Sequence, residues 1–201
     1  EDVVADLPEK IEDTVMAQLA GEQRKLYLAN QDRIAQQVQH REAGEFKKDK
    51  LKVLAELTKL RQICCDPRLH YEDYKAGSAK LDTCMELVHG ALDGGHRILL
   101  FSQFTGMLDI IGKRLSKEDI AFLKLTGASS KESRAKMVAQ FQAGEVPVFL
   151  ISLKAGGVGL NLTAADVVIH YDPWWNVAAQ DQATDRAHRI GQQHTVTVYK
   201  L

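Results

Sequence analysis

The 201-residue sequence has little cysteine, no long apolar run and almost no excess of charge of either sign. Its three cysteines, Cys64, Cys65 and Cys84, are an odd number and two are adjacent, so a disulfide framework is not expected. Reduced thiols are favoured over a zinc site made with His70, because neighbouring cysteines cannot easily share one ion. No stretch approaches the roughly 18–20 apolar residues that span a bilayer, so no membrane contact is expected.

Lys and Arg together number 26, against 27 Asp and Glu. A domain that holds nucleic acid by bulk charge alone is far more basic. Any contact with nucleic acid is therefore expected to come from a local patch or from backbone amides.

Apolar residues make up 45% of the chain, which is enough for a core and excludes an intrinsically disordered protein. The polar first part predicts helices over 22–43 and 47–65, then a linker over 66–79. The chain begins without Met and stops inside a strand-like run, so we expect it to be part of a longer protein. A cytoplasmic or a nuclear location fits equally well.

From Lys80 onward, short apolar runs alternate with amphipathic helices. Strands are expected over residues 97–102, 120–125, 146–152, 167–172 and 195–201. A helix is expected over 130–141, with Ser129 and Glu132 spaced as a capping box. Another is expected over 177–190. The pattern predicts an α/β fold, a doubly wound parallel sheet with helices on both faces, preceded by a helical N-terminal extension.

A glycine-rich run, SLKAGGVGLN at residues 152–161, directly follows one of the expected strands. Its glycines Gly156, Gly157 and Gly159 allow a sharp turn that presents consecutive amides to a phosphate, and Lys154 adds a positive charge. A tight turn that merely needs small residues explains the run about equally well.

Gln182, Arg186 and Arg189 share one face of the expected helix over 177–190, which leaves the sheet after the run DPWWN at residues 172–176. Ligands bind at the carboxyl edge of such sheets, where two arginines suit a polyphosphate. A solvated charged face is the alternative. Trp174 and Trp175 could stack on bases, but core packing is favoured.

Two further polar turns, FSQF at residues 101–104 and LTGAS at 125–129, follow strands and could offer amides and hydroxyls to a sugar-phosphate backbone. No P-loop is present, and no strand ends in an acidic pair for Mg²⁺. The sequence therefore has arginines for a nucleotide without the cradle or the metal site.

DPWWN and the following QATDRAHRIGQ at residues 182–192 resemble the last motifs of the SWI/SNF-type ATPases of helicase superfamily two. The runs at 152–161, at 101–104 and at 125–127 with Arg134 resemble earlier motifs in the order of that family. LRQICCDP at residues 60–67 and LPEK at 7–10 are similar to its bridge between lobes. The resemblance covers nearly the whole chain.

The resemblance implies the second of two RecA-like lobes, over residues 76–201 and truncated at its C-terminal end, after a helical inter-lobe or protrusion segment over 1–75. It implies a lobe of an ATP-dependent translocase on double-stranded DNA, inactive alone, whose first lobe holds most of the ATP and Mg²⁺. DNA-bound proteins are further possible partners.

The resemblance also implies residue roles. Arg186 and Arg189 would be arginine fingers, with Gln182, Gly159 and Asn161 near the nucleotide. The residues that fall where the family contacts the DNA backbone are Gln103, Thr126, Gly127, Ser152, Lys154, Ala155 and Gly156. No residue is expected to bind a metal.

Three positions depart from the family pattern: Val177 stands where Pro is common, and in one turn Thr126 stands where Asp is usual and Ala128 where Ser is common. The hydroxyl contact of that turn is therefore in doubt. The alternatives are a lobe of a helicase that acts on RNA or single strands, and a non-catalytic interaction module.

Overall fold

The computed structural model describes residues 7–39, 46–155, 159–173 and 176–201. The chain forms two compact units, one made of Glu1–Met16 with Cys84–Leu201 and the other of Ala17–Thr83. The second unit ends at Thr83 and leaves Glu1–Met16 to the first, whereas the expected division between residues 75 and 76 stays a prediction. Within the described residues, no helix is both long and apolar enough to cross a membrane.

The larger unit is built on a six-stranded sheet with the order β1-β6-β5-β2-β4-β3, in which every neighbouring pair is parallel. The strands are β1 (Lys10–Thr14), β2 (Ile98–Ser102), β3 (Phe122–Leu125), β4 (Val148–Ser152), β5 (Val167–His170) and β6 (Val196–Lys200). All residues of β2, β4 and β5 are buried, as their apolar sequences predict.

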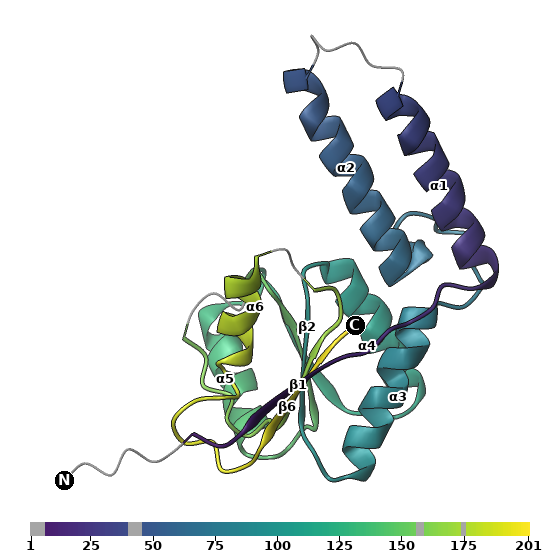
Figure 1. Ribbon diagram of the computed structural model, residues 1–201. Helices are drawn as coiled ribbons and strands as arrows, with labels where there is room; N and C mark the ends of the chain where they lie inside the picture. The colour runs from purple at the N-terminus through teal and green to yellow at the C-terminus, as the bar shows by residue number, and fades with distance from the viewer. Residues whose placement is uncertain (1–6, 40–45, 156–158, 174–175) are drawn as a thin grey trace. The chain divides into compact units, whose positions relative to one another are not determined.

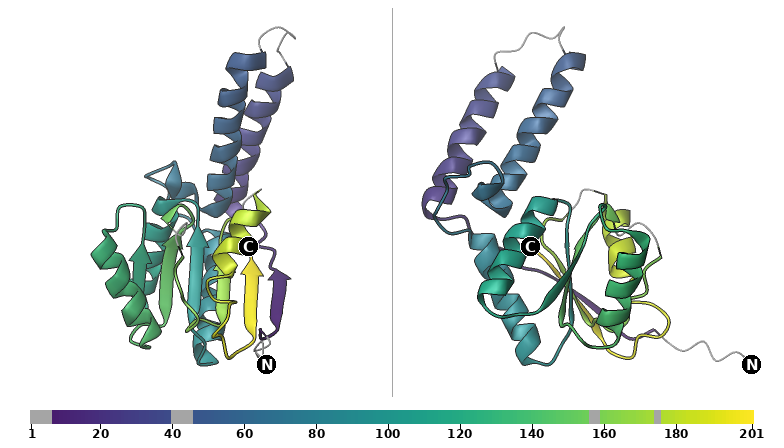
Figure 2. Two further views of the ribbon diagram at one scale, coloured as in Figure 1. Left: turned by 90° about the vertical axis from the view of Figure 1, so that its left-hand side faces the viewer. Right: turned by 180° about the vertical axis from the view of Figure 1, so that it is seen from behind.

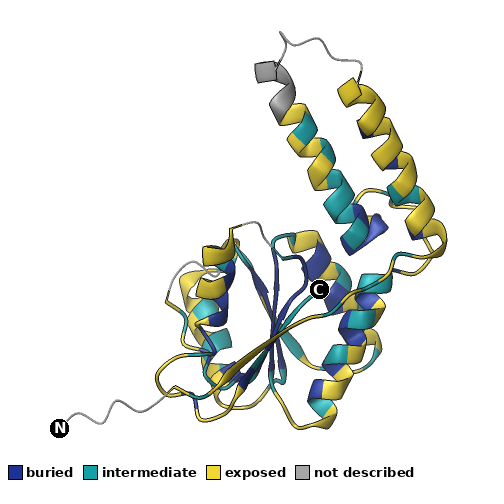
Figure 3. Ribbon diagram, viewed as in Figure 1, coloured by how far each residue is buried: buried dark blue, intermediate teal, exposed yellow. Residues whose placement is uncertain are grey.

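Helices cover both faces of this sheet (Figure 1). One face carries α4 (Thr105–Lys117) and most of α3 (Ala79–Asp93), and the other carries α5 (Lys131–Gln142) and α6 (Val177–Thr184). Figure 2 shows the strands side by side, with β1 and β6 at one edge. Buried residues are concentrated along the strands and the helix faces that meet them (Figure 3). The doubly wound α/β fold is therefore confirmed.

The core on the α5 and α6 side joins the central strands to the helices. Phe101, Phe149 and Val168 pack with Phe141 of α5 and Ala183 of α6 in one buried cluster. The Phe141 and Phe149 ring centroids are 5.4 Å apart. This packing fixes α6, and with it the residues that follow it, against the sheet.

The second unit is a helical hairpin of α1 (Gly21–Gln39) and α2 (Phe46–Cys65), followed by a short 3-10 helix, η1 (Pro67–Leu69). Buried Gln23 donates from Nε2 to the Ile63 carbonyl at 2.9 Å and accepts at Oε1 from the Ala79 N–H at 3.0 Å. The segment expected to be a linker thus includes η1, which Asp66 caps by accepting from the Arg68 N–H.

Two local expectations need correction. The N-cap of α5 is Ser130, whose Oγ accepts from the Ser133 N–H at 3.1 Å, whereas the Ser129 hydroxyl accepts from the Thr126 N–H at 3.2 Å. Strand β1 lies within the segment expected to be helical, because it pairs along its length with β6.

Candidate functional site

Helix α6 ends at Thr184, so the expected helix over 177–190 was too long. The carbonyls of Arg186 and Ala187 accept from the Leu162 N–H at 3.0 Å and from Gln192 Nε2 at 3.0 Å, respectively. They are therefore turned away from helical partners further along the chain. Residues 185–190, which we name the arginine turn, carry Arg186 and Arg189 outside any regular helix.

A cavity of about 490 Å³ nevertheless brings together Gln182, Arg186, Arg189 and Gly159. Its other lining residues are Leu7, Leu160, Asp185, His188 and Ile190. Four of the five residues expected near a nucleotide thus line one cavity, although they do not share one helix face.

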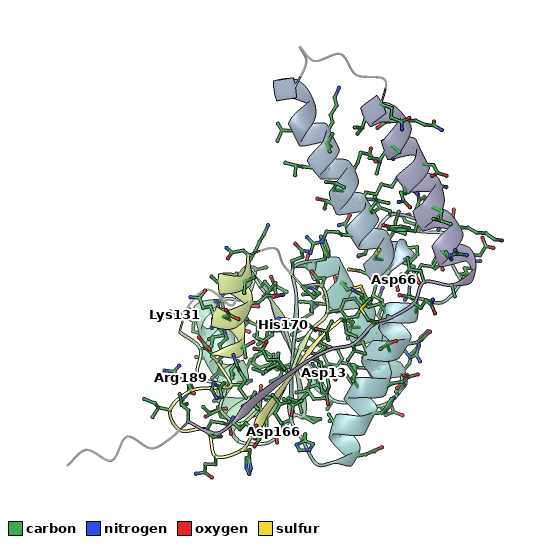
Figure 4. The ribbon with its side chains drawn as sticks, viewed as in Figure 1. Asp13, Asp66, Lys131, Asp166, His170 and Arg189 are labelled. Carbon is green, nitrogen blue, oxygen red and sulfur yellow. The ribbon has the colours of Figure 1, made fainter. Side chains whose placement is uncertain are left out.

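The arginine turn lies away from the carboxyl edge of the sheet. Its residue His188 has Nε2 at 2.7 Å from the carbonyl oxygen of Pro8, which precedes β1. Leu162, which is bonded to the Arg186 carbonyl, precedes β5. Figure 4 shows Arg189 on the side of the sheet that α5 and α6 cover. Helix α6 starts after the carboxyl end of β5 and carries the chain back along this face.

The Arg186 guanidinium lies in an unusual environment. Only 5% of the residue is exposed, and its Nε and Nη1 are buried without a hydrogen-bond partner. Burial lowers the pKa of Arg186, and the positive charge of Arg189 lowers this pKa further. A buried cation with unused donors beside a second cation is poorly stabilised on its own, and an anion in the cavity would satisfy both.

Asn161, the fifth residue expected near the nucleotide, lines a second cavity of about 650 Å³. This cavity lies along α5, where Lys131, Arg134 and Val138 contribute to its wall. Gly159 and Leu160 line both cavities. Figure 4 shows Lys131 near the start of α5, on the same side of the sheet as Arg189.

The residues expected to contact DNA follow three adjacent strands, β2, β4 and β3, at their carboxyl ends. The register pairs Ser102 with Ser152 and Leu125 with Ile151, so Thr126 follows β3 at the level of Ser152. Gln103 follows Ser102, and its N–H donates to Asp172 Oδ2 at 3.0 Å. The structure thus brings these turns to one edge of the sheet.

The residues expected to contact DNA differ in how far they are exposed to solvent. Lys154 and Gly127 are exposed and Thr126 is half-buried, but the side chains of Ser152 and Ala155 are buried. The Ala155 carbonyl accepts from Arg134 Nη1 at 2.9 Å. Gln103 Nε2 is buried without a hydrogen-bond partner. Gly156 and Gly157, like Trp174 and Trp175, lie outside the described residues.

Sequence reasoning missed residues that support the site. His170 Nε2 lies 2.9 Å from Thr184 Oγ1, which joins β5 to the last turn of α6. His170 is buried, and burial lowers its pKa to about 4. Gln192 bonds to several backbone groups around the arginine turn. Its only sequence signal was its place at the end of the QATDRAHRIGQ run.

Two of the three cysteines, Cys64 and Cys65, end α2, and Cys84 lies in α3. Burial raises the pKa of the Cys64 thiol. Across the described part of the chain, His, Cys, Asp and Glu side chains form no group of three that could hold an ion.

Comparison with known proteins places these features in a family. Residues 79–191 match the model described as "Helicase conserved C-terminal domain". An uncharacterized ATP-dependent helicase of Mycoplasma pneumoniae is 38% identical over 200 residues, which cover 99% of this chain and 19% of that protein. The chromatin-remodeling ATPase INO80 of Aspergillus oryzae is 47% identical over 125 residues, covering 62% of this chain and 9% of that protein.

Among solved structures, the Sulfolobus solfataricus SWI2/SNF2 ATPase core in complex with dsDNA superposes with a TM-score of 0.83 and 36% identity. The match covers 98% of this chain and 42% of that one. The chain spans about a fifth of the length of the curated relatives that it matches from end to end.

Proposed function

The chain belongs to the helicase conserved C-terminal domain family, as a RecA-like lobe of the SWI/SNF type, and we propose that it is the second motor lobe of an ATP-dependent translocase on double-stranded DNA. In this proposal the first lobe of the same protein binds ATP and Mg²⁺, and this lobe completes the site. The protein would then be a DNA-dependent ATPase only at full length, so we expect the 201-residue chain alone to be inactive.

The observation that carries the proposal is the buried Arg186 guanidinium with unpartnered Nε and Nη1 in a cavity that Arg189 and Gln182 also line. A γ-phosphate presented by the first lobe would accept hydrogen bonds from these donors. Arginines that neutralise the charge developing in phosphoryl transfer are worth about 10³–10⁵ in turnover. Gln182 would add a polar contact to the same nucleotide.

Gly159 and Asn161 would flank the nucleotide from the chain segment beside the arginine turn. Gly159 is exposed and has a positive φ of 33°, and nothing lies within 4 Å of the position that a Cβ would take. The backbone can therefore be approached closely at this point, which suits a nucleotide but also an ordinary turn.

On the DNA side, we propose contacts to the phosphate backbone from the exposed groups at the carboxyl edge, foremost Lys154 and the turn at Thr126 and Gly127. The buried Ser152 and Ala155 would take part through their backbone, together with Gly156 and Gln103. The complex of the archaeal relative with dsDNA supports duplex DNA as the partner. With roughly two to four phosphates engaged by this lobe, binding should weaken only modestly with salt.

The test is ATP turnover by the full-length protein with no nucleic acid, duplex DNA, single-stranded DNA or RNA. We expect duplex DNA to stimulate turnover strongly, and Arg189→Ala to abolish that stimulation while duplex binding stays nearly intact. Arg24→Ala, which removes an exposed arginine of α1, is the matched control.

Turnover like that of the wild type in Arg189→Ala would refute the arginine-finger assignment. Equal stimulation by RNA or single strands would point to another helicase branch, and no turnover with any nucleic acid would favour a non-catalytic module. A bacterial protein would act in the cytoplasm and a eukaryotic one in the nucleus, with DNA-bound proteins as further partners.

A further inference from the structure

Gln192 follows the arginine turn and uses its whole side-chain amide on backbone groups. The residue is only 7% exposed. Its Nε2 lies 2.7 Å from the Ala165 carbonyl oxygen, 3.0 Å from that of Ala187 and 3.1 Å from that of Thr163. Its Oε1 accepts from the N–H groups of Gln193 and His194, both at 2.9 Å.

These bonds join the loop after Asn161 to the arginine turn, and the proposed function requires these two segments to keep a fixed position relative to each other. Thr163 and Ala165 belong to the loop that continues from Gly159 and Asn161, and Ala187 lies between Arg186 and Arg189. A backbone bond from the Leu162 N–H to the Arg186 carbonyl at 3.0 Å closes the same junction. Gln192 therefore ties the arginine turn to the loop at a point one residue from Arg186.

We propose that Gln192 is a positioning residue, which holds the arginine turn against the loop after Asn161 so that Arg186 and Arg189 face the γ-phosphate in reactive geometry. The inference rests on the proposed function and extends it to a residue that does not line the cavity. Arg189 is exposed, so its guanidinium depends on a fixed backbone for its direction. Misplacement of a catalytic group by about 1 Å can cost roughly 10²-fold in rate.

The chemistry of the contacts selects glutamine. All three neighbours of Nε2 are carbonyl oxygens, which only accept, and both neighbours of Oε1 are N–H groups, which only donate. A carboxylate has no donor for the carbonyls and would repel them. Asparagine keeps the amide but is one methylene shorter, so it reaches fewer of these partners.

The experiment measures duplex-stimulated ATP turnover by the full-length protein carrying Gln192→Ala, Gln192→Glu or Gln192→Asn. The control is Gln193→Ala, which changes the same residue type at the adjacent, exposed position and leaves its backbone N–H in place. Alongside kcat and the KM for ATP, the affinities for ADP and for ADP with aluminium fluoride are measured. The second complex mimics the transferring phosphoryl group.

We expect kcat to fall about 10- to 100-fold in Gln192→Ala, with KM for ATP and duplex affinity within about threefold of wild type. Gln192→Glu should be at least as slow, Gln192→Asn intermediate, and Gln193→Ala unchanged. Affinity for ADP with aluminium fluoride should drop by a factor similar to that for kcat, while affinity for ADP alone is kept, because positioning acts on the transition state.

A purely structural role predicts a different result. Turnover per folded molecule would then stay at the wild-type level, and ADP and its aluminium fluoride complex would weaken together or not at all; either result overturns the proposal. If Gln192→Ala and Gln192→Glu fail to fold, Gln192→Asn decides by the same two readouts. Arg189→Ala separates the proposals, because full turnover in that variant refutes the proposed function, whereas its loss together with normal turnover in Gln192→Ala refutes only this inference.

Discussion

Replacing the buried Arg186 by methionine should make the 201-residue chain more stable. Methionine has a similar length and fills irregular space well, so most packing is kept. The substitution removes a cation that is 95% buried and carries two donor atoms, Nε and Nη1, without partners. It also removes the repulsion from Arg189 that helps to lower the pKa of Arg186.

The size of the effect follows from the cost of unsatisfied donors. Each buried donor left without a partner costs about 1–3 kcal/mol, and part of this is offset by the packing of the Arg stem, which methionine replaces only in part. A net gain of about 2 kcal/mol in the free energy of unfolding is therefore expected. At about 2–4 °C per kcal/mol for a chain of this size, the Tm should rise by roughly 4–8 °C.

The assay is thermal and urea unfolding of the wild-type chain and Arg186→Met, without and with tripolyphosphate as an anion probe. At a concentration 100 times its Kd, the probe should stabilise the wild type by about 2.7 kcal/mol and leave Arg186→Met nearly unchanged. Arg24→Met is the control for replacing an arginine that is exposed on α1. A lower Tm for Arg186→Met than for wild type would show that the guanidinium already has adequate partners, and would refute the reasoning.

Two further predictions concern the sheet and its helices. Burial lowers the pKa of His170 from 6.5 to about 4. As the pH falls, the imidazole is therefore protonated in the unfolded chain before it is protonated in the folded chain. About 3 kcal/mol of the free energy of unfolding that is present above pH 6.5 should be lost as the pH falls toward 4. His170→Gln should remove that part of the pH dependence of unfolding, and an unchanged slope would contradict it. A Cβ on Gly112 of α4 would lie 2.9 Å from Phe122 Cζ, whereas one on Gly90 of α3 would meet nothing within 4 Å. Gly112→Ala should therefore destabilise by about 1–2 kcal/mol and Gly90→Ala should stabilise by up to about 1 kcal/mol; equal effects in urea unfolding would contradict the predicted clash.

The sequence predicted those strands that are marked by a continuous apolar run within their own few residues. The runs that became β2 and β4 are apolar except for the serine that ends each of them, because both of their faces are covered. Strand β1, with the sequence KIEDT, is exposed at every position and borders only β6. Its Glu12 pairs with Lys10 and with Lys200, a residue 188 positions away, so no local pattern could reveal it.

The end of α6 was missed for a similar reason. Helical spacing of Gln182, Arg186 and Arg189 is satisfied equally by a long helix and by a short helix followed by a turn. Which of the two forms depends on Leu162 and Gln192, which donate hydrogen bonds to the carbonyls of Arg186 and Ala187, respectively. The residues of the candidate site could be named from their motif, whereas their arrangement in space depends on these tertiary bonds.

The geometry also limits how far the two halves of the proposed site can be from each other. The chain passes from Ala155, at the edge where we propose DNA contacts, to Gly159, at the arginine cavity, in four residue steps. A fully extended chain covers at most about 3.6 Å per residue, so these two positions are no more than roughly 14 Å apart. Arg134 also relates the two regions, because its Nη1 donates to the Ala155 carbonyl and the residue lines the cavity that Gly159 and Asn161 share. If DNA contacts the chain at Ala155 as proposed, that contact would therefore lie within roughly 14 Å of Gly159 at the arginine cavity.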